Sequence, residues 1–132
     1  MSGLSDREVL AKTIYGEARG ESREGQEAVG HVIKNRAQAN RSEWGGNSIS
    51  GVCLQPKQFE CWNGRGDIEI KEPGPYEQCC QVADSILNGS SQDPTRGADH
   101  YNNPNKEPNA EWPEKCTVLG DVGQHRFYKG PN

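Results

Sequence analysis

The sequence predicts a mainly α (α+β) fold with long ordered loops and a small C-terminal hairpin or extended segment. Apolar residues recur at helical spacing in three stretches of the first 90 positions, and only two short β-prone runs follow, near the C-terminus. The 16 glycines and eight prolines gather between these stretches, where they indicate ordered loops. With 132 residues and no linker or repeat, we expect residues 1–132 to form one domain.

The first helix is expected to run from about Asp6 to the Gly16–Gly20 region. Ser5 followed by Glu8 has the form of a capping box, which satisfies free N–H groups at a helix start. The core-facing stripe of this helix is expected to contain Val9, Leu10, Thr13 and Ile14.

Two further helices are expected. The second begins at Ser22 and ends near Asn40, and the third begins at Gly74-Pro75 and ends at Asn88-Gly89, where a left-handed cap would stop it. The core-facing residues of the second are expected to be Ala28, Val29, Val32, Ile33 and Arg36, and those of the third Cys79, Cys80, Val82, Ala83, Ile86 and Leu87.

The remaining segments are read as irregular. From Arg41 to Pro73 the pattern allows only short helices, and the chain after Gly89 is expected to be loop as far as residue 116. The runs 117–119 and 125–128 flank Gly120 and Gly123 and are expected to pair as a small hairpin or to stay extended.

Composition excludes several classes of partner. The net charge is −4 and there is no basic block, so we expect no nucleic acid partner. No segment reaches the roughly 18 apolar residues of a membrane span, and no basic start precedes an apolar run, so we expect cytoplasmic synthesis without a signal peptide and no membrane insertion. We expect a monomer.

The cysteines and histidines show no metal or redox spacing. The five cysteines are 53, 61, 79, 80 and 116, none in a CxxC pair, and Cys53 with Cys61 is the first pair to test for a disulfide because both flank one loop. His31, His100 and His125 lack tight ligand spacing, so we expect neither a metal nor a cofactor.

Glu17 is the strongest candidate for chemistry. It lies three residues after Ile14 on the apolar stripe, which carries its carboxylate to the edge of the core. Removal from water penalises the charged form, so a carboxyl group there is suited to donate a proton near neutral pH. Gly16 and Gly20 flank it, and both are costly in a helix, which indicates a bend or a close approach at this point.

The same residues also permit a structural reading. Glu17 could be a solvated residue paired with Arg19 or Arg23. Glu21, one turn further on if the helix continues, is expected to be a structural or pKa-tuning neighbour of Glu17.

Two loop segments, residues 58–63 and 100–104, combine aromatic rings with short amides, a combination suited to sugar rings and their hydroxyl groups. We expect Glu17, Gln58, Phe59, Trp62, Tyr101, Asn102 and Tyr128 to line one concavity, although any single aromatic residue there could serve packing alone. The expected substrate-binding residues are Tyr15, Gln58, Phe59, Trp62, Tyr101, Asn102, His125 and Tyr128.

Five segments in order, covering nearly the whole chain, resemble the SleB/CwlJ-type cell-wall hydrolases. They are residues 14–21, 25–36, 58–62, 101–104 and 123–128, beginning with the Gly-Glu-Ala-Arg-Gly-Glu run at Gly16. The resemblance implies a lysozyme-like, mostly helical fold and cleavage of the β-1,4 bond between N-acetylmuramic acid and N-acetylglucosamine of bacterial peptidoglycan, with Glu17 as catalytic acid.

The second step of such a reaction stays open. A hydrolytic muramidase needs a second carboxylate about 5 to 9.5 Å from the first; Glu60 and Asp67 are the first candidates, with Asp99 and Glu21 also available. If none serves, Glu17 acts again as base on the muramoyl 6-hydroxyl, the lytic transglycosylase outcome that we favour. The lack of a leader further suggests a phage endolysin that reaches the wall after release.

Two other classes of protein remain open. One is a non-catalytic peptidoglycan-binding module, and the other is an amidase or peptidase that would need zinc or an activated cysteine.

Overall fold

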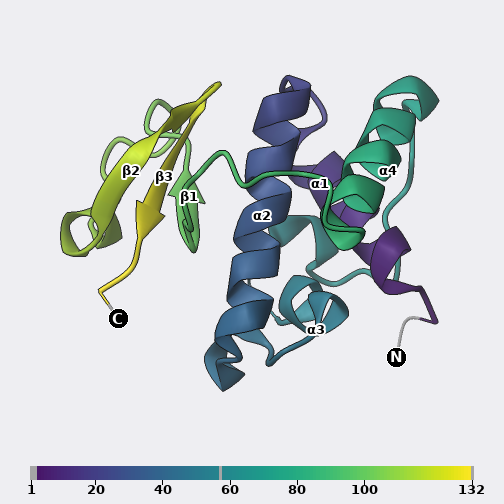
Figure 1. Ribbon diagram of the computed structural model, residues 1–132, viewed down its shortest axis with the longest axis horizontal. Helices are drawn as coiled ribbons and strands as arrows, with labels where there is room; N and C mark the ends of the chain where they lie inside the picture. Colours follow the sequence, from purple (N-terminus) through teal and green to yellow (C-terminus); the bar gives the residue numbers. More distant parts are fainter. Residues whose placement is uncertain (1–2, 57, 132) are drawn as a thin grey trace.

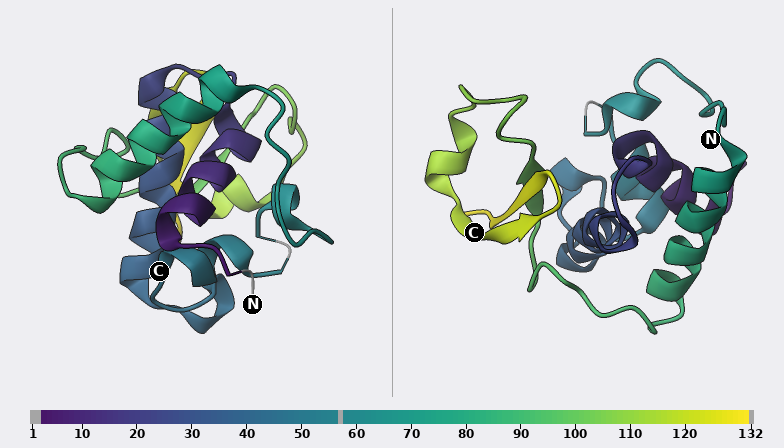
Figure 2. Two further views of the ribbon diagram at one scale, coloured as in Figure 1. Left: turned by 90° about the vertical axis from the view of Figure 1, so that its right-hand side faces the viewer. Right: turned by 90° about the horizontal axis from the view of Figure 1, so that it is seen from above.

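The structure, a computed structural model, describes residues 3–56 and 58–131. Helix α2 stands in the middle of the molecule, with α1, α3 and α4 on one side and a three-stranded sheet on the other (Figures 1 and 2). The four α-helices are α1 (Asp6–Ala18), α2 (Arg23–Ala39), α3 (Ile49–Leu54) and α4 (Pro73–Leu87), the strands are β1 (His100–Asn102), β2 (Thr117–Val122) and β3 (His125–Lys129), and the 3-10 helices are η1 (Ser42–Trp44), η2 (Glu60–Trp62) and η3 (Trp112–Lys115).

Helix α1 confirms the sequence prediction at both ends. The Ser5 hydroxyl accepts from the Glu8 backbone N–H and the Glu8 carboxylate accepts from that of Ser5, so the capping box is present. The four residues of its predicted stripe are fully buried. The helix ends at Ala18, before Glu21, which therefore does not lie one helical turn beyond Glu17.

Helices α2 and α4 pack their predicted faces into the core, with two differences at α4. Asn40 caps α2 in the left-handed conformation, at φ 53°. Helix α4 begins at Pro73, slightly before the predicted start. Leu87, expected to be buried, is 43% exposed because it occupies the last position of the helix, where the core has ended.

The sheet has the antiparallel order β1-β3-β2. Strands β2 and β3 form the expected C-terminal hairpin, which turns at Gly123 with φ 60°. Strand β1 differs from the sequence prediction, because its three residues were expected to be loop. It pairs with β3 through Tyr101 opposite Phe127, and this pairing fixes the direction of the Tyr101 side chain.

Polar contacts join the helices to the sheet. We call residues 6–87 the helical half and residues 98–129 the sheet half. Arg36 Nε in α2 donates to the Asp99 carbonyl at 2.8 Å, and Asn35 Nδ2 donates to the Ala98 carbonyl at 2.9 Å. The backbone N–H of Gln124 donates to Glu21 Oε1 at 3.1 Å. These bonds hold the sheet at a fixed position against α2.

All five cysteines are free thiols, so the Cys53 to Cys61 disulfide considered from the sequence does not form. Within residues 3–56 and 58–131, no helix has both the length and the apolar character needed to cross a membrane.

Candidate active site

Glu17 lies in the last turn of α1, and buried hydrogen bonds fix the end of that helix. Gln26 of α2 is fully buried and its amide nitrogen donates to the carbonyls of Ala18 at 3.3 Å and Glu21 at 3.4 Å. The Gln26 side-chain oxygen accepts from Gln78 of α4 at 3.0 Å. The sequence analysis did not select Gln26, because a single Gln on a helix carries no sequence signal for such a role.

Gly16 permits a close approach, as its position beside Glu17 suggested. A Cβ atom at this position would lie 2.6 Å from the Cys61 Cβ and 2.8 Å from its Sγ. The approaching group is therefore a side chain of this protein. Gly20 has open space around it, and nothing in the structure explains its need for glycine.

Tyr101 is the direct partner of Glu17. Its hydroxyl donates to Glu17 Oε1 at 2.6 Å, joining residues 84 positions apart. Burial and the neighbouring carboxylate raise the pKa of Tyr101 well above its ordinary value, so the hydroxyl keeps its proton and remains a donor. Arg19 instead pairs with Glu72 at 2.7 Å, and Arg23 contacts Gln81, so neither arginine takes the pairing role considered for it.

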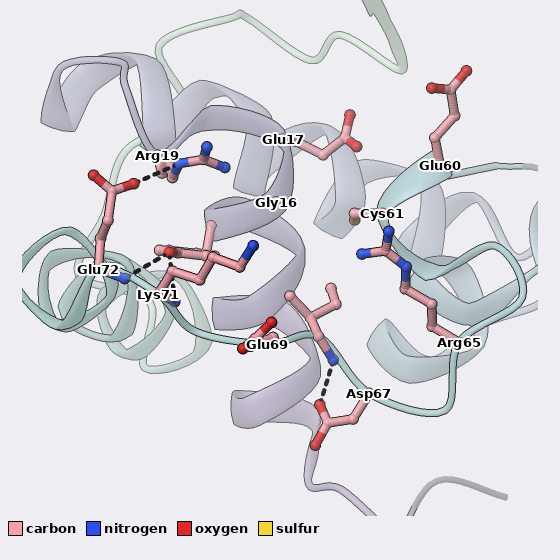
Figure 3. A pocket seen from close by; sticks show the side chains of 12 residues that line it. Gly16, Glu17, Arg19, Glu60, Cys61, Arg65, Asp67, Glu69, Lys71 and Glu72 are labelled. Atoms are coloured by element: carbon pink, nitrogen blue, oxygen red, sulfur yellow. Dashed lines mark hydrogen bonds and ion pairs between the residues drawn. The ribbon is translucent and has the colours of Figure 1, made fainter.

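A charged cavity of about 830 Å³ lies on one side of Glu17. Figure 3 shows the Arg65 guanidinium and the Lys71 ammonium pointing into it, with Glu17 and Glu60 at the same edge. Its acidic and basic side chains are Glu17, Arg19, Glu60, Arg65, Asp67, Glu69, Lys71 and Glu72.

A polar cavity of about 510 Å³ lies on the other side of Glu17 and reaches the sheet. It brings together most of the residues expected to bind sugar, since Glu17, Gln58, Phe59, Tyr101, Asn102 and His125 all line it. Five of the seven residues predicted to line one concavity therefore do so, whereas Trp62 and Tyr128 do not, and Phe59 is only 3% exposed.

Three of the expected substrate-binding residues are packing residues instead. Trp62 is 6% exposed and its indole N–H donates to Thr13 Oγ1 at 2.8 Å, so it belongs to the core. Tyr128 lines neither cavity, because its buried hydroxyl donates to Asn102 Oδ1 at 2.9 Å behind the site. Tyr15 borders the charged cavity but is buried, and its hydroxyl accepts from the N–H groups of Lys71 and Glu72.

The candidate second carboxylates differ sharply in their surroundings. Glu21 is held by the Gln124 N–H in the hairpin turn and lines neither cavity. Asp67 binds Lys12 at 2.9 Å, and this hydrogen bond lowers the pKa of Asp67. Asp99 is buried under the sheet, where it binds His100 at 2.8 Å. Glu60 is exposed and lines both cavities together with Glu17, which makes it the remaining candidate.

His125 and Cys61 complete the surroundings of Glu17. Burial lowers the pKa of His125, which is therefore neutral at pH 7, and its ring meets that of Tyr101 edge-on at 5.1 Å. Burial, together with the nearby Glu17 carboxylate, raises the pKa of Cys61 to about 12. A thiol that stays protonated is a poor nucleophile, which argues against a cysteine amidase or peptidase. Among the described residues, no group of three or more His, Cys, Asp or Glu is placed to hold a metal ion.

Comparison with known proteins shows the family. Residues 20–128 match the Cell Wall Hydrolase family. This chain belongs to that family. It is 34% identical over 128 residues to the spore cortex-lytic enzyme of Halalkalibacterium halodurans and 33% identical over 123 residues to that of Bacillus subtilis. The matches cover 96% and 93% of this chain but only 36% and 37% of those relatives, so the chain spans little more than a third of their length.

The fold agrees with solved domains of the family. The catalytic domain of the germination-specific lytic transglycosylase SleB from Bacillus anthracis superposes with a TM-score of 0.78 at 33% identity, covering 96% of this chain and 98% of that domain. The catalytic domain of Bacillus cereus SleB gives 0.76 at 32% identity, with 96% and 93% covered. The predicted α+β class is thus confirmed, and the chain matches these two solved catalytic domains over nearly their whole length.

Proposed function

We propose that this protein cleaves the β-1,4 bond between N-acetylmuramic acid and N-acetylglucosamine in peptidoglycan as a lytic transglycosylase, with Glu17 as acid and then base. The observation that carries the proposal is the Tyr101 to Glu17 hydrogen bond of 2.6 Å at the boundary between two cavities. A glycan strand that occupies both cavities would pass this carboxyl group, and the solved SleB relative named as a lytic transglycosylase supports the reaction class.

The geometry suggests how one carboxyl group serves twice. Tyr101 occupies Oε1, which leaves Oε2 to present the proton. Glu17 gives this proton to the glycosidic oxygen as the bond from C1 to that oxygen breaks, because an alkoxide leaves poorly. The resulting carboxylate, stabilised by Tyr101, takes the proton of the muramoyl 6-hydroxyl while O6 bonds to C1. The products are a free N-acetylglucosamine 4-hydroxyl and a 1,6-anhydro end, and no water is consumed.

A hydrolytic muramidase is the second candidate, and the position of Glu60 favours it. Glu60 lines both cavities with Glu17, as a base that activates water would. Its side chain stands free at the exposed edge in Figure 3, whereas Glu17 is half-buried and held. We therefore prefer the single-carboxylate reaction.

Matched amide substitutions test the assignment. Glu17→Gln keeps the shape of the side chain but has no acidic proton, so we expect release of soluble fragments from purified peptidoglycan to fall by on the order of 10²-fold or more. Glu60→Gln should retain activity within about threefold, since exposed substitutions without a bonded partner change little. Equal, large losses in both variants would favour the muramidase, and wild-type turnover by Glu17→Gln would refute the proposal.

Binding to insoluble wall separates an enzyme from a binding module. We expect Glu17→Gln to sediment with peptidoglycan as the wild type does while releasing no fragments. The endolysin role and the monomeric state stay predictions.

A further inference from the structure

A third concavity, the aromatic groove, opens beyond the polar cavity. It encloses about 590 Å³ and shares Arg36, Gln58 and Tyr101 with the polar cavity, so the two cavities adjoin. The residues that line the groove alone are Trp44, His100, Trp112, Lys115, Cys116 and Pro131. No feature of the proposed reaction uses these six residues.

Its floor is a row of rings from three separate elements. The ring of His100 in β1 lies 5.8 Å from that of Trp44 in η1 and 5.5 Å from that of Trp112 in η3. His100 Nδ1 is bonded to Asp99, which fixes this ring between the two indoles. The guanidinium carbons of Arg36 and Arg41 lie over the Trp44 ring, 5.4 and 4.7 Å from its centre. Half-buried rings held in this way offer apolar surface with little loss of side-chain entropy on binding, and the two guanidinium groups cover part of the Trp44 ring.

The backbone holds the loop that carries Trp44. Gly45, at φ 98°, ends η1, and a Cβ there would clash with the Gly51 carbonyl oxygen of α3. Only glycine fits this contact, so the loop is packed on α3. A fixed loop argues for a preformed surface at Trp44.

The three tryptophans have different environments. Trp62 is a core residue whose indole N–H is satisfied by Thr13. Trp44 and Trp112 are half-buried and face the groove. A tryptophan that serves packing alone would be expected to resemble Trp62.

We propose that the aromatic groove binds further N-acetylhexosamine units of the same glycan strand, beyond those in the polar cavity; this inference rests on the proposed function. A linear polymer cut at Glu17 must continue past Tyr101, and the groove adjoins the polar cavity at that residue. Its described lining contains Arg36 and Lys115 but no carboxylate, unlike the charged cavity. Such a lining suits a strand whose muramoyl units carry carboxyl groups.

Strand length provides the test. The substrates are purified glycan strands of graded length with their stem peptides removed. The wild-type kcat/KM should rise with length until the groove is filled. In Trp44→Ala and Trp112→Ala, kcat/KM on long strands should fall by about tenfold, a typical loss for an aromatic contact surface, while the shortest cleaved strand should change by less than about twofold.

Control variants separate binding from folding. Val118→Ala removes an exposed apolar side chain from β2 of the same sheet and should leave the length dependence unchanged. Trp44→Phe and Trp112→Phe keep a ring and the packing, so they should give intermediate losses on long strands even if an alanine variant fails to fold.

Three results would overturn the inference. One is a length dependence that the folded tryptophan variants leave unchanged, and another is an equal loss on short and long strands. The third is a loss seen only with strands that keep their stem peptides, which would make the groove a peptide site. If the wild type cleaved no strand of any length, the proposed function would fail first and this inference with it.

Discussion

The two halves of the molecule each supply one member of the Glu17 and Tyr101 pair, and they are built differently. The helical half buries long apolar stripes from α1, α2 and α4, so its core fixes the position of Glu17. The sheet half has three short strands, and exposed or half-buried positions dominate β2. It joins the shared core through Ala98 and Phe127 and is tied to α2 by polar bonds. The acid is therefore held by a large apolar core together with Gln26, and its hydrogen-bond donor by a smaller apolar contact together with a polar junction to α2.

The largest effect is expected from breaking that junction. Arg36→Met removes the donor to the Asp99 carbonyl and the bond to Gln58, both largely buried. Leaving buried acceptors unpaired should lower the free energy of unfolding by about 2 to 3 kcal/mol, measured by urea denaturation. Arg126→Met is the matched control, since its exposed ion pair with Asp121 should contribute little to the free energy of unfolding. Equal losses in both variants would contradict the role of the junction.

A smaller effect should separate catalysis from packing within the sheet half. Tyr101→Phe removes the donor to Glu17, and we expect kcat/KM on peptidoglycan to fall by about tenfold, equivalent to about 1.4 kcal/mol, with little change in Tm. Tyr128→Phe removes the buried bond to Asn102 and should instead lower the free energy of unfolding by about 1 kcal/mol while turnover is retained. The reverse pattern would show that Tyr101 is only a packing residue.

The smallest expected effect is a dependence of the free energy of unfolding on pH, to which one histidine of each half contributes. Burial lowers the pKa of His31 in α2 and of His125 in β3 from the ordinary 6.5. Below about pH 6.5 the unfolded chain therefore binds more protons than the folded one, and the free energy of unfolding falls as the pH drops from about 7 to about 5. Denaturation at several pH values should show a shallower slope in His31→Gln and in His125→Gln. An unchanged slope in either variant would exclude that residue as a source.

The sequence predicted the helical half far better than the sheet half. Helices α1, α2 and α4 show long stripes, with serine N-caps on α1 and α2 and proline in the first turn of α4, so their existence and the edge position of Glu17 could be inferred. Strand β1 has three residues, too few for an alternating pattern, and exists only because β3 pairs with it.

Only part of the candidate site could be predicted from the sequence, because the burial of a side chain also depends on contacts with residues far away in the chain. Gln58, Tyr101 and Asn102 were found because short amides and rings stand together in the loops. The burial of Trp62 depends on Thr13, 49 residues away, and a loop sequence carries no sign of such a contact. The position of the half-buried Trp112 ring in the aromatic groove likewise could not be predicted, because it depends on the fold of the whole chain.

The central claim is that Glu17 acts alone, first as acid and then as base. Digestion of purified peptidoglycan in heavy-oxygen water, followed by mass analysis of the muropeptides, tests it most directly. If Glu17 acts alone, the products are 1,6-anhydro-N-acetylmuramic acid ends that carry no label and weigh one water less than a reducing end. Labelled reducing ends would contradict it and would assign the second step to a water molecule activated by another carboxylate, with Glu60 at the shared edge of both cavities as the residue to replace.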